Sequence, residues 1–146
     1  MKLPIAQSMS HNNYSATYRV YYEDTDAQRV MYYANYLKFA ERARTDFLRA
    51  MGIAQINLMQ ENNLIFVVRK CTIEYFAPAL LDDLIEVSAE IKSVSNTSMV
   101  VLQNFKKAGK IINTIEVVIV CVDAVTVRPK RIPENIRILL PSGKNV

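Results

Sequence analysis

The chain lacks the residue on which many hydrolytic sites depend. Among its 146 residues there is one histidine, His11, in the polar stretch His11-Asn12-Asn13 near the N-terminus. A Ser-His-Asp or Cys-His triad needs a histidine that the fold places beside the nucleophile, and a multi-histidine zinc site has the same requirement. Chain ends are commonly poorly ordered, so His11 is a weak candidate for either role. We therefore expect no metal or cofactor, and an enzyme built on this chain would use carboxylates and backbone dipoles.

Glycine, cysteine and long apolar runs are also scarce. Three glycines and five prolines exclude a collagen-like or low-complexity chain. Cys71 and Cys121 lie in apolar segments, which predicts buried free thiols in a reducing compartment. The apolar run from Val117 to Val122 is too short to cross a bilayer, and the N-terminus lacks the apolar segment of a secretion signal. These absences favour a cytoplasmic protein.

The length and charge set the scale of the molecule. A chain of 146 residues fits one domain, which we place at residues 16–140, with tails at 1–15 and 141–146. The 18 basic and 14 acidic side chains give a net charge of +4. This excess suits an anionic ligand but is too small and scattered to indicate nucleic-acid binding by itself.

Hydrophobic periodicity predicts one long helix after one strand. Residues 16–22 are rich in tyrosine and valine, which is typical of a strand. From Tyr33 to Met51 the apolar residues recur every three or four positions, as in an amphipathic helix. Gly52 follows as a natural C-cap, and Arg49 lies in the last turn, where the helix dipole favours a cation.

The remainder of the chain predicts strands. The segments are 64–76, 84–92, 98–105 and 111–127, with a loop or short helix at 57–63. Apolar and polar residues alternate in 84–92, which predicts a sheet with one covered and one wetter face. One helix must cover this sheet, so we expect an α+β fold in which a curved antiparallel sheet of about five strands wraps the helix. Uncovered edges and faces of such a sheet are commonly paired between copies, which predicts a symmetric homo-oligomer.

An acidic turn joins the first strand to the helix. Glu23, Asp24 and Asp26 crowd into four positions. Acidic residues at such a place commonly cap the helix and complement its dipole. A cap needs only one side chain, however, and Asp26 precedes the clear helical periodicity by several residues. In the functional alternative, Asp26 faces the carbon of a carbonyl group whose oxygen is bound by the unpaired amides at the helix start.

At these residues the chain resembles the hotdog-fold acyl-CoA thioesterases of the 4-hydroxybenzoyl-CoA thioesterase type. The likeness is greatest to the branch associated with the bacterial Tol-Pal cluster, the YbgC-like branch. It runs from about Tyr18 to Pro133, and the segments that carry it are 20–26, 34–37, 41–44, 66–69, 74–79, 81–83 and 120–123. The resemblance implies an antiparallel sheet around a long helix, assembly as dimers or tetramers, and hydrolysis of acyl-CoA to free acid and CoA.

The resemblance also implies roles for particular residues. Asp26 takes the place of the catalytic aspartate, as nucleophile or general base, and Tyr33 takes the place whose backbone amide polarises the thioester carbonyl. Glu41 falls at an acidic helix position that lines or supports the substrate site. Arg29 stands where the family usually has glycine; a positive φ there would strain the backbone by about 1–3 kcal/mol. Its side chain could narrow the acyl entrance or attract CoA phosphate.

Other features leave alternatives open. Arg128, Lys130 and Arg131 form a basic cluster that could bind the phosphates of CoA or the acidic face of acyl carrier protein, although solvated surface charge is the more common explanation. A non-catalytic acyl-CoA or acyl carrier protein binding module of the same fold is one alternative to an enzyme. A basic all-strand nucleic-acid binder is another, but the tyrosines cluster around the acidic turn rather than among the basic residues.

Overall fold

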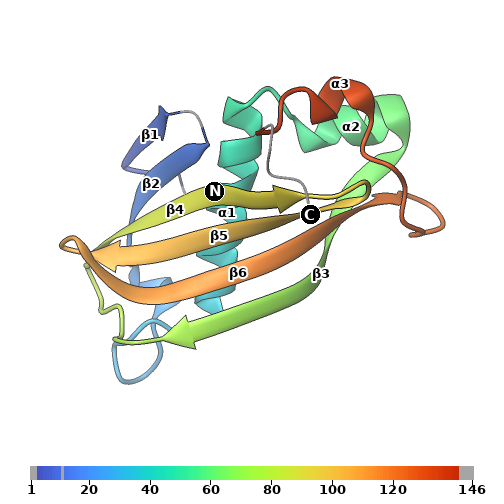
Figure 1. Cartoon of the computed structure of the whole chain (residues 1–146). Coiled ribbons are helices and arrows are strands. Elements are labelled where there is room, and N and C mark those ends of the chain that lie inside the picture. Colours follow the sequence, from blue (N-terminus) through green and yellow to red (C-terminus); the bar gives the residue numbers. More distant parts are fainter. Residues whose placement is uncertain (1–2, 11, 142–146) are drawn as a thin grey trace.

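A single antiparallel sheet and three α-helices make up the computed structural model, which describes residues 3–10 and 12–141 (Figure 1). His11 therefore lies outside the described residues. The strand order is β1-β2-β4-β5-β6-β3. The elements are β1 (Ala6–Ser10), β2 (Asn13–Arg19), the 3-10 helix η1 (Tyr22–Asp24), α1 (Asn35–Ala50), α2 (Gln55–Asn62), β3 (Leu64–Tyr75), β4 (Leu84–Val94), β5 (Ser98–Lys107), β6 (Lys110–Asp123) and α3 (Glu134–Arg137).

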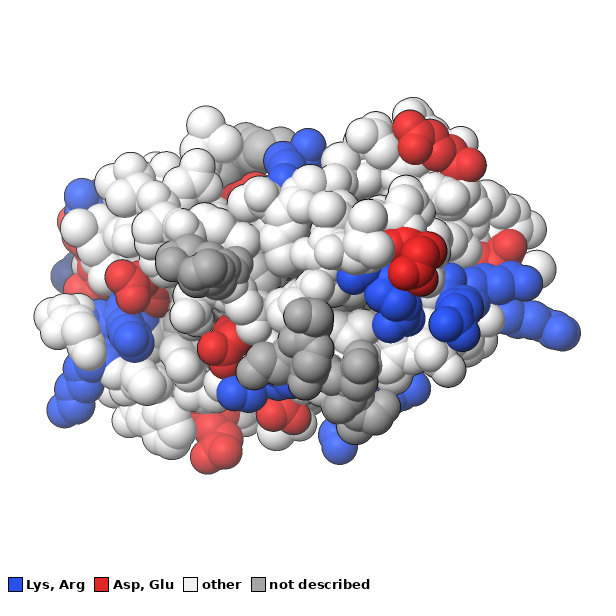
Figure 2. Space-filling model, turned by 45° about the horizontal axis from the view of Figure 1, so that its top comes forward, with Lys and Arg blue, Asp and Glu red and all other residues white. Residues whose placement is uncertain are grey.

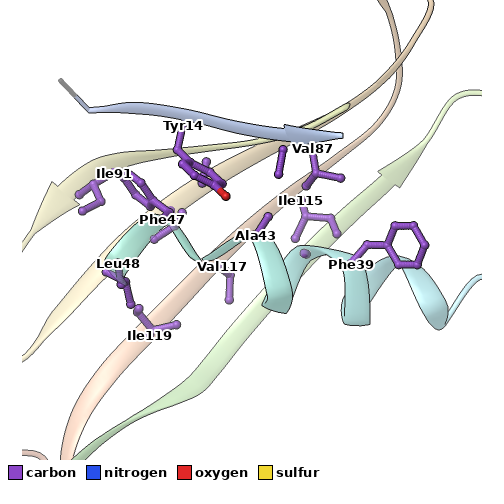
Figure 3. Close-up of a cluster of buried hydrophobic side chains, with 14 of the residues drawn as sticks. Tyr14, Phe39, Ala43, Phe47, Leu48, Val87, Ile91, Ile115, Val117 and Ile119 are labelled. Atoms are coloured by element: carbon purple, nitrogen blue, oxygen red, sulfur yellow. The ribbon is translucent and has the colours of Figure 1, made fainter. Parts of the chain in front are cut away.

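Helix α1 crosses one face of the sheet and supplies the centre of the core (Figures 1 and 3). Its buried side chains include Phe39, Ala43 and Phe47, none of which is exposed. They pack against side chains that alternate along the strands, such as Val87 and Ile115. The alternation expected in residues 84–92 is thus confirmed, and the predicted α+β fold with a wrapped central helix is confirmed with it.

The end of α1 follows the sequence signal closely. Gly52 adopts a φ of +95°, and its N–H donates to the carbonyl of Arg49 at 3.0 Å. The next N–H, of Ile53, reaches back to the carbonyl of Leu48 at 2.8 Å. Glycine pays no Cβ penalty in this left-handed conformation, so it ends the helix where predicted.

The first strand pair corrects the sequence prediction. Residues 6–10 form β1 inside the stretch assigned to an N-terminal tail, and β2 begins at Asn13 instead of Ala16. The sheet consequently has six strands rather than about five. The physical reason is that β1 lies at a sheet edge, where backbone hydrogen bonds to β2 hold a polar strand without an apolar pattern.

Other boundaries also shift. Strand β6 ends at Asp123 rather than near residue 127, because the Asp123 carboxylate accepts the N–H groups of Val125 and Thr126, both at 2.8 Å, and turns the chain. These hydrogen bonds also lower the pKa of Asp123. The segment predicted as a loop or short helix at 57–63 is largely helical, as α2.

Strand β3 forms the other edge of the sheet, and its position corrects the prediction for one cysteine. Cys121 in β6 is buried, whereas Cys71 in β3 is exposed; both are free thiols. Cys71 was expected to be buried because its segment is apolar, but β3 has one neighbouring strand only, and Val68 in the same strand is 52% exposed. No helix among the described residues is long and apolar enough to span a membrane.

Candidate active site

The acidic turn after β2 forms a tight hairpin loop. The N–H of Asp26 donates to the carbonyl of Val30, and the N–H of Arg29 donates to the carbonyl of Asp26, both at 3.0 Å. One oxygen of the exposed Asp26 carboxylate accepts the N–H of Gln28 at 2.8 Å. Residues 30 and 31 then pair with 79 and 80, which anchors the loop to the body of the protein. Asp26 thus presents an exposed carboxylate from a fixed backbone.

Arg29 occupies the left-handed position of this loop, with a φ of 65°. A three-residue hairpin loop of this kind normally places glycine there, because a side chain in this conformation costs about 1–2 kcal/mol. The strain that the sequence suggested for an arginine at this position is therefore present. The Arg29 side chain itself is exposed.

We expect Arg29→Gly to stabilise the protein slightly. Relief of the left-handed strain outweighs the extra freedom that glycine gives the unfolded chain, so the net gain is about 0.5–1 kcal/mol. Urea unfolding of the two proteins measures it. Gln28→Gly in the same loop is the matched control and should destabilise, because the φ of Gln28 is not positive. A lower midpoint for Arg29→Gly would show that the arginine side chain stabilises the turn.

The residues between the loop and α1 are held by Asp24. Its carboxylate accepts the N–H of Tyr21 at 2.8 Å and so caps η1. Its carbonyl accepts both the N–H of Tyr32 at 3.0 Å and the side-chain amide of Asn35 at 2.7 Å. Sequence reasoning missed Asn35, which ties the first residue of α1 to the acidic turn. No acidic side chain of the described residues caps α1, the helix for which such a cap was considered, and Asp24 caps the short η1 instead.

The start of α1 leaves a backbone donor available. The helix begins at Asn35, and its N-cap residue, Ala34, makes no side-chain cap hydrogen bond. Among the described residues, the N–H of Tyr33 donates to no acceptor. The carbonyl of Tyr33, by contrast, accepts the hydroxyl of Tyr75 at 2.9 Å. An unpaired N–H at a helix start is a ready donor for a carbonyl oxygen or an anion.

An aromatic pocket of about 330 Å³ opens beside this helix start. The residues that line it are Met31, Tyr33, Tyr36, Tyr75, Phe76, Ala77 and Pro78. Tyr36 and Tyr75 meet edge to face, with ring centroids 5.2 Å apart. Burial raises the pKa of both tyrosines, so both hydroxyls stay protonated at neutral pH. The pocket is apolar with few polar groups, as small-molecule sites usually are.

The pocket-lining residues of β3 and of the loop after it were not predicted as site residues. The segment 74–79 contributed to the family resemblance, but nothing in its pattern shows that it folds against residues 31–36. The register of β3 against β6 and the bridge from Val30 to Leu80 create that contact. The cluster of tyrosines around the acidic turn was the available signal.

Glu41 lies in a different hollow. It lines a groove of about 250 Å³ between α1 and β3, together with Arg44, Thr45, Leu48, Gln55, Phe66, Val68 and Ile119. Arg44 donates to the side-chain carbonyl of Gln103 at 3.0 Å. Burial lowers the pKa of Arg44, and the Glu41 carboxylate opposes that shift. Within one chain, Glu41 and the Tyr33 pocket therefore line separate hollows.

The predicted basic cluster is also distant from the acidic turn. Arg128, Lys130 and Arg131 are exposed and follow β6, whose last residues pair with the first residues of β3. Figure 1 places this segment at the end of the sheet opposite the acidic turn, and Figure 2 shows Lys and Arg side chains gathered at that end. Among the described residues no group of three or more His, Cys, Asp or Glu side chains is arranged to hold a metal ion.

Comparisons with known proteins agree on one family. The model of the Thioesterase-like superfamily matches residues 20–140. The acyl-CoA thioester hydrolase YbgC of Escherichia coli O6:H1 is 49% identical over 119 residues, which cover 81% of this chain and 88% of that protein. The acyl-CoA thioesterase YbgC of Haemophilus influenzae is 38% identical over 129 residues, covering 88% and 95%.

Solved structures give the same result. A probable thioesterase from Bartonella henselae superposes with a TM-score of 0.77 at 31% identity, covering 82% of this chain and 98% of that one. The BH1999 gentisyl-coenzyme A thioesterase has a TM-score of 0.79 at 24% identity over 87% and 99%, and supports the fold alone. The chain therefore belongs to the Thioesterase-like superfamily and is an acyl-CoA thioester hydrolase with the hotdog fold.

Proposed function

We propose that Asp26 and the backbone amide of Tyr33 perform the hydrolysis together. The thioester carbonyl oxygen binds the Tyr33 N–H, and its carbon faces the Asp26 carboxylate. The observation that carries this proposal is the unpaired N–H of Tyr33 at the helix start, in a residue that lines an apolar pocket next to the acidic loop. An aligned oxyanion donor is worth about 3–4 kcal/mol, and a nucleophile or general base adds about 10²–10⁴-fold.

Two chemical courses are open to Asp26. As a nucleophile, its oxygen bonds to the carbonyl carbon, the carbon–sulfur bond breaks, and the CoA thiolate leaves. Water then hydrolyses the acyl-aspartate to the free acid and the Asp26 carboxylate. As a general base, it removes a proton from water, which attacks the carbon directly while the CoA thiolate leaves. Rapid-quench mass spectrometry separates the two, because only the first course adds the mass of the acyl group to the peptide that contains Asp26.

The acyl group occupies the aromatic pocket. Its volume of about 330 Å³ is near the lower end of small-molecule sites, which span about 300–1,000 Å³, and favours a short or single-ring acyl group. Tyr36 is firmly placed there because its hydroxyl accepts the N–H of Ala79 at 3.0 Å. CoA is part of the substrate, and the mechanism requires no further cofactor.

Pairing of two copies through β3 completes the site. An exposed edge with unpaired backbone groups favours such pairing, and β3 exposes Val68 and Cys71 on it. In an antiparallel pair, the Tyr75 end of one β3 lies beside the Leu64 end of the other. The Glu41 groove and the segment 128–131 of one copy thereby approach the acidic loop of the other, where Arg128, Lys130, Arg131 and Arg29 can bind CoA phosphates or acyl carrier protein.

A reducing, cytoplasmic location fits the thiol chemistry. Cys71 is exposed and free, and an exposed free thiol persists most readily where disulfides are kept reduced. The tetrameric assembly and the association with the Tol-Pal cluster stay predictions from the sequence resemblance.

Tyr75→Phe should lower kcat while leaving KM nearly unchanged. The hydroxyl holds the carbonyl of Tyr33, and its loss frees the helix start that must present the oxyanion donor. Since one hydrogen bond contributes about 0.5–1.5 kcal/mol, we expect a roughly three- to tenfold fall. Steady-state kinetics measure it, with Tyr22→Phe at a 77% exposed position as the control. A rise in KM alone would mean that Tyr75 only contacts the acyl group.

A further inference from the structure

A fully buried amide lies in β6 without a hydrogen-bond partner. The side chain of Asn113 is 0% exposed, and neither its oxygen nor its nitrogen meets a partner among the described residues. Each buried polar group left unpaired costs about 1–3 kcal/mol, and native proteins pair about nine in ten of them. An asparagine that leaves both atoms unpaired therefore calls for a physical reason.

The position of Asn113 connects it to the aromatic pocket. It pairs in register with Tyr75 of β3 and with Phe105 of β5, so the three side chains lie side by side on the same face of the sheet. The ring of Tyr36 lies over them, 5.2 Å from the Tyr75 ring and 5.6 Å from the Phe105 ring. Asn113 is not among the residues that line the pocket, but it is the cross-strand neighbour of Tyr75, which does line it.

The protein does satisfy a comparable amide nearby. Gln103 in β5 lies two residues from Phe105 on the same face and is also 0% exposed. Its oxygen accepts from Arg44 at 3.0 Å, and its nitrogen donates to the carbonyl of Ala40 at 3.0 Å. The contrast shows that this face of the sheet can satisfy a buried amide, whereas the described residues around Asn113 leave its amide unpaired.

We propose that Asn113 is the polar end of the acyl pocket and binds one oxygen of the acyl group, a hydroxyl distant from the thioester. The proposal rests on the acyl site described above. The Tyr75 ring forms the barrier and is 46% exposed. Its hydroxyl oxygen lies on the axis of the Cβ–Cγ bond, so rotation of the ring about that axis can admit the acyl group while the hydroxyl keeps its hydrogen bond to the carbonyl of Tyr33. An amide both donates and accepts, which matches a hydroxyl group.

A hydrogen bond from Asn113 to the acyl hydroxyl would select between substrates with and without that hydroxyl. A site whose buried polar groups pair only with the correct substrate rejects the analogue that lacks the hydroxyl, because those groups then stay unpaired. Asn113 should therefore act on the ratio of kcat/KM between two substrates that differ by one hydroxyl. It is a specificity-determining residue in this scheme and takes no part in breaking the carbon–sulfur bond.

The test compares two pairs of substrates in the full-length protein. The pairs are butyryl-CoA with 3-hydroxybutyryl-CoA and benzoyl-CoA with 4-hydroxybenzoyl-CoA. In at least one pair, the wild type should have a kcat/KM about tenfold or more higher for the hydroxylated substrate. The pair that shows this preference tells whether the hydroxyl group that Asn113 binds is carried by an aliphatic or an aromatic acyl group. Asn113→Leu should bring the ratio close to one. Asn104→Leu is the matched control, since Asn104 faces the other side of the sheet and bonds Thr114.

Every outcome bears on the proposal. A wild type without preference in either pair, or an Asn113→Leu protein that keeps the wild-type ratio, overturns it. If Asn113→Leu fails to fold, Asn113→Ala replaces it, and its kcat/KM ratio between the paired substrates is interpreted in the same way. Failure of the proposed catalytic site is recognised separately, because Asp26→Asn would then leave turnover of all four substrates intact.

Discussion

Asp26→Asn should lower kcat by about 10²–10⁴-fold while thioester binding stays nearly intact. Asparagine has the same shape and can still accept the N–H of Gln28, so the loop should keep its geometry. What it loses is the negative charge that attacks the carbonyl carbon or removes a proton from water. Release of free CoA thiol, measured at saturating acyl-CoA, gives kcat, and equilibrium binding of the same substrate gives its affinity.

The control for this result is Glu23→Gln, which removes a neighbouring exposed carboxylate of the same acidic turn. It should retain most of the wild-type kcat, which would exclude a general effect of local charge. Normal turnover by Asp26→Asn would end the assignment of Asp26. A fall in binding with unchanged kcat would instead assign it to substrate recognition.

Val68→Asp should give a folded monomer with kcat/KM lowered about a hundredfold or more. Val68 is 52% exposed in the single chain, so an aspartate there remains hydrated and folding is little affected. In a pair of copies joined through β3, the charge would be buried against an apolar edge, and burial of an unpaired charge is strongly unfavourable. Sedimentation measures the mass, and thiol release measures the activity.

The comparison variant is Ile138→Asp, which places the same charge at a 71% exposed apolar position just after α3. It should leave both mass and activity unchanged. A Val68→Asp protein that is monomeric and fully active would show that one chain suffices for catalysis. A variant that remains a dimer would show that the copies associate through another surface.

Where one physical signal dominates, the sequence predicted the fold well. The amphipathic repeat of α1 and the alternation in β4 were recognised because burial of one face selects those patterns. Strand β1 was missed because an edge strand depends on backbone hydrogen bonds rather than on side-chain pattern. The exposure of Cys71 was missed because strand order, which puts β3 at the edge, is a tertiary property.

In the candidate site, too, some residues could be proposed from the sequence and others could not. The acidic turn pointed to Asp26, and the resemblance to the thioesterase family assigned roles to Asp26 and Tyr33. It also identified Arg29 as a departure, and the left-handed φ there explains why glycine would suit the position. Tyr75 and Asn113 were out of reach, because the register of three strands brings them to Tyr36.

The most direct test of the account is the carbonyl stretch of a bound substrate. Asp26→Asn should hold an acyl-CoA without rapid turnover, so that difference Raman spectroscopy can record its thioester C=O band. A donor hydrogen bond from the Tyr33 amide polarises the carbonyl, and the band should move to lower frequency than in water. An unshifted band in the bound complex would contradict the claim that the helix start polarises the thioester.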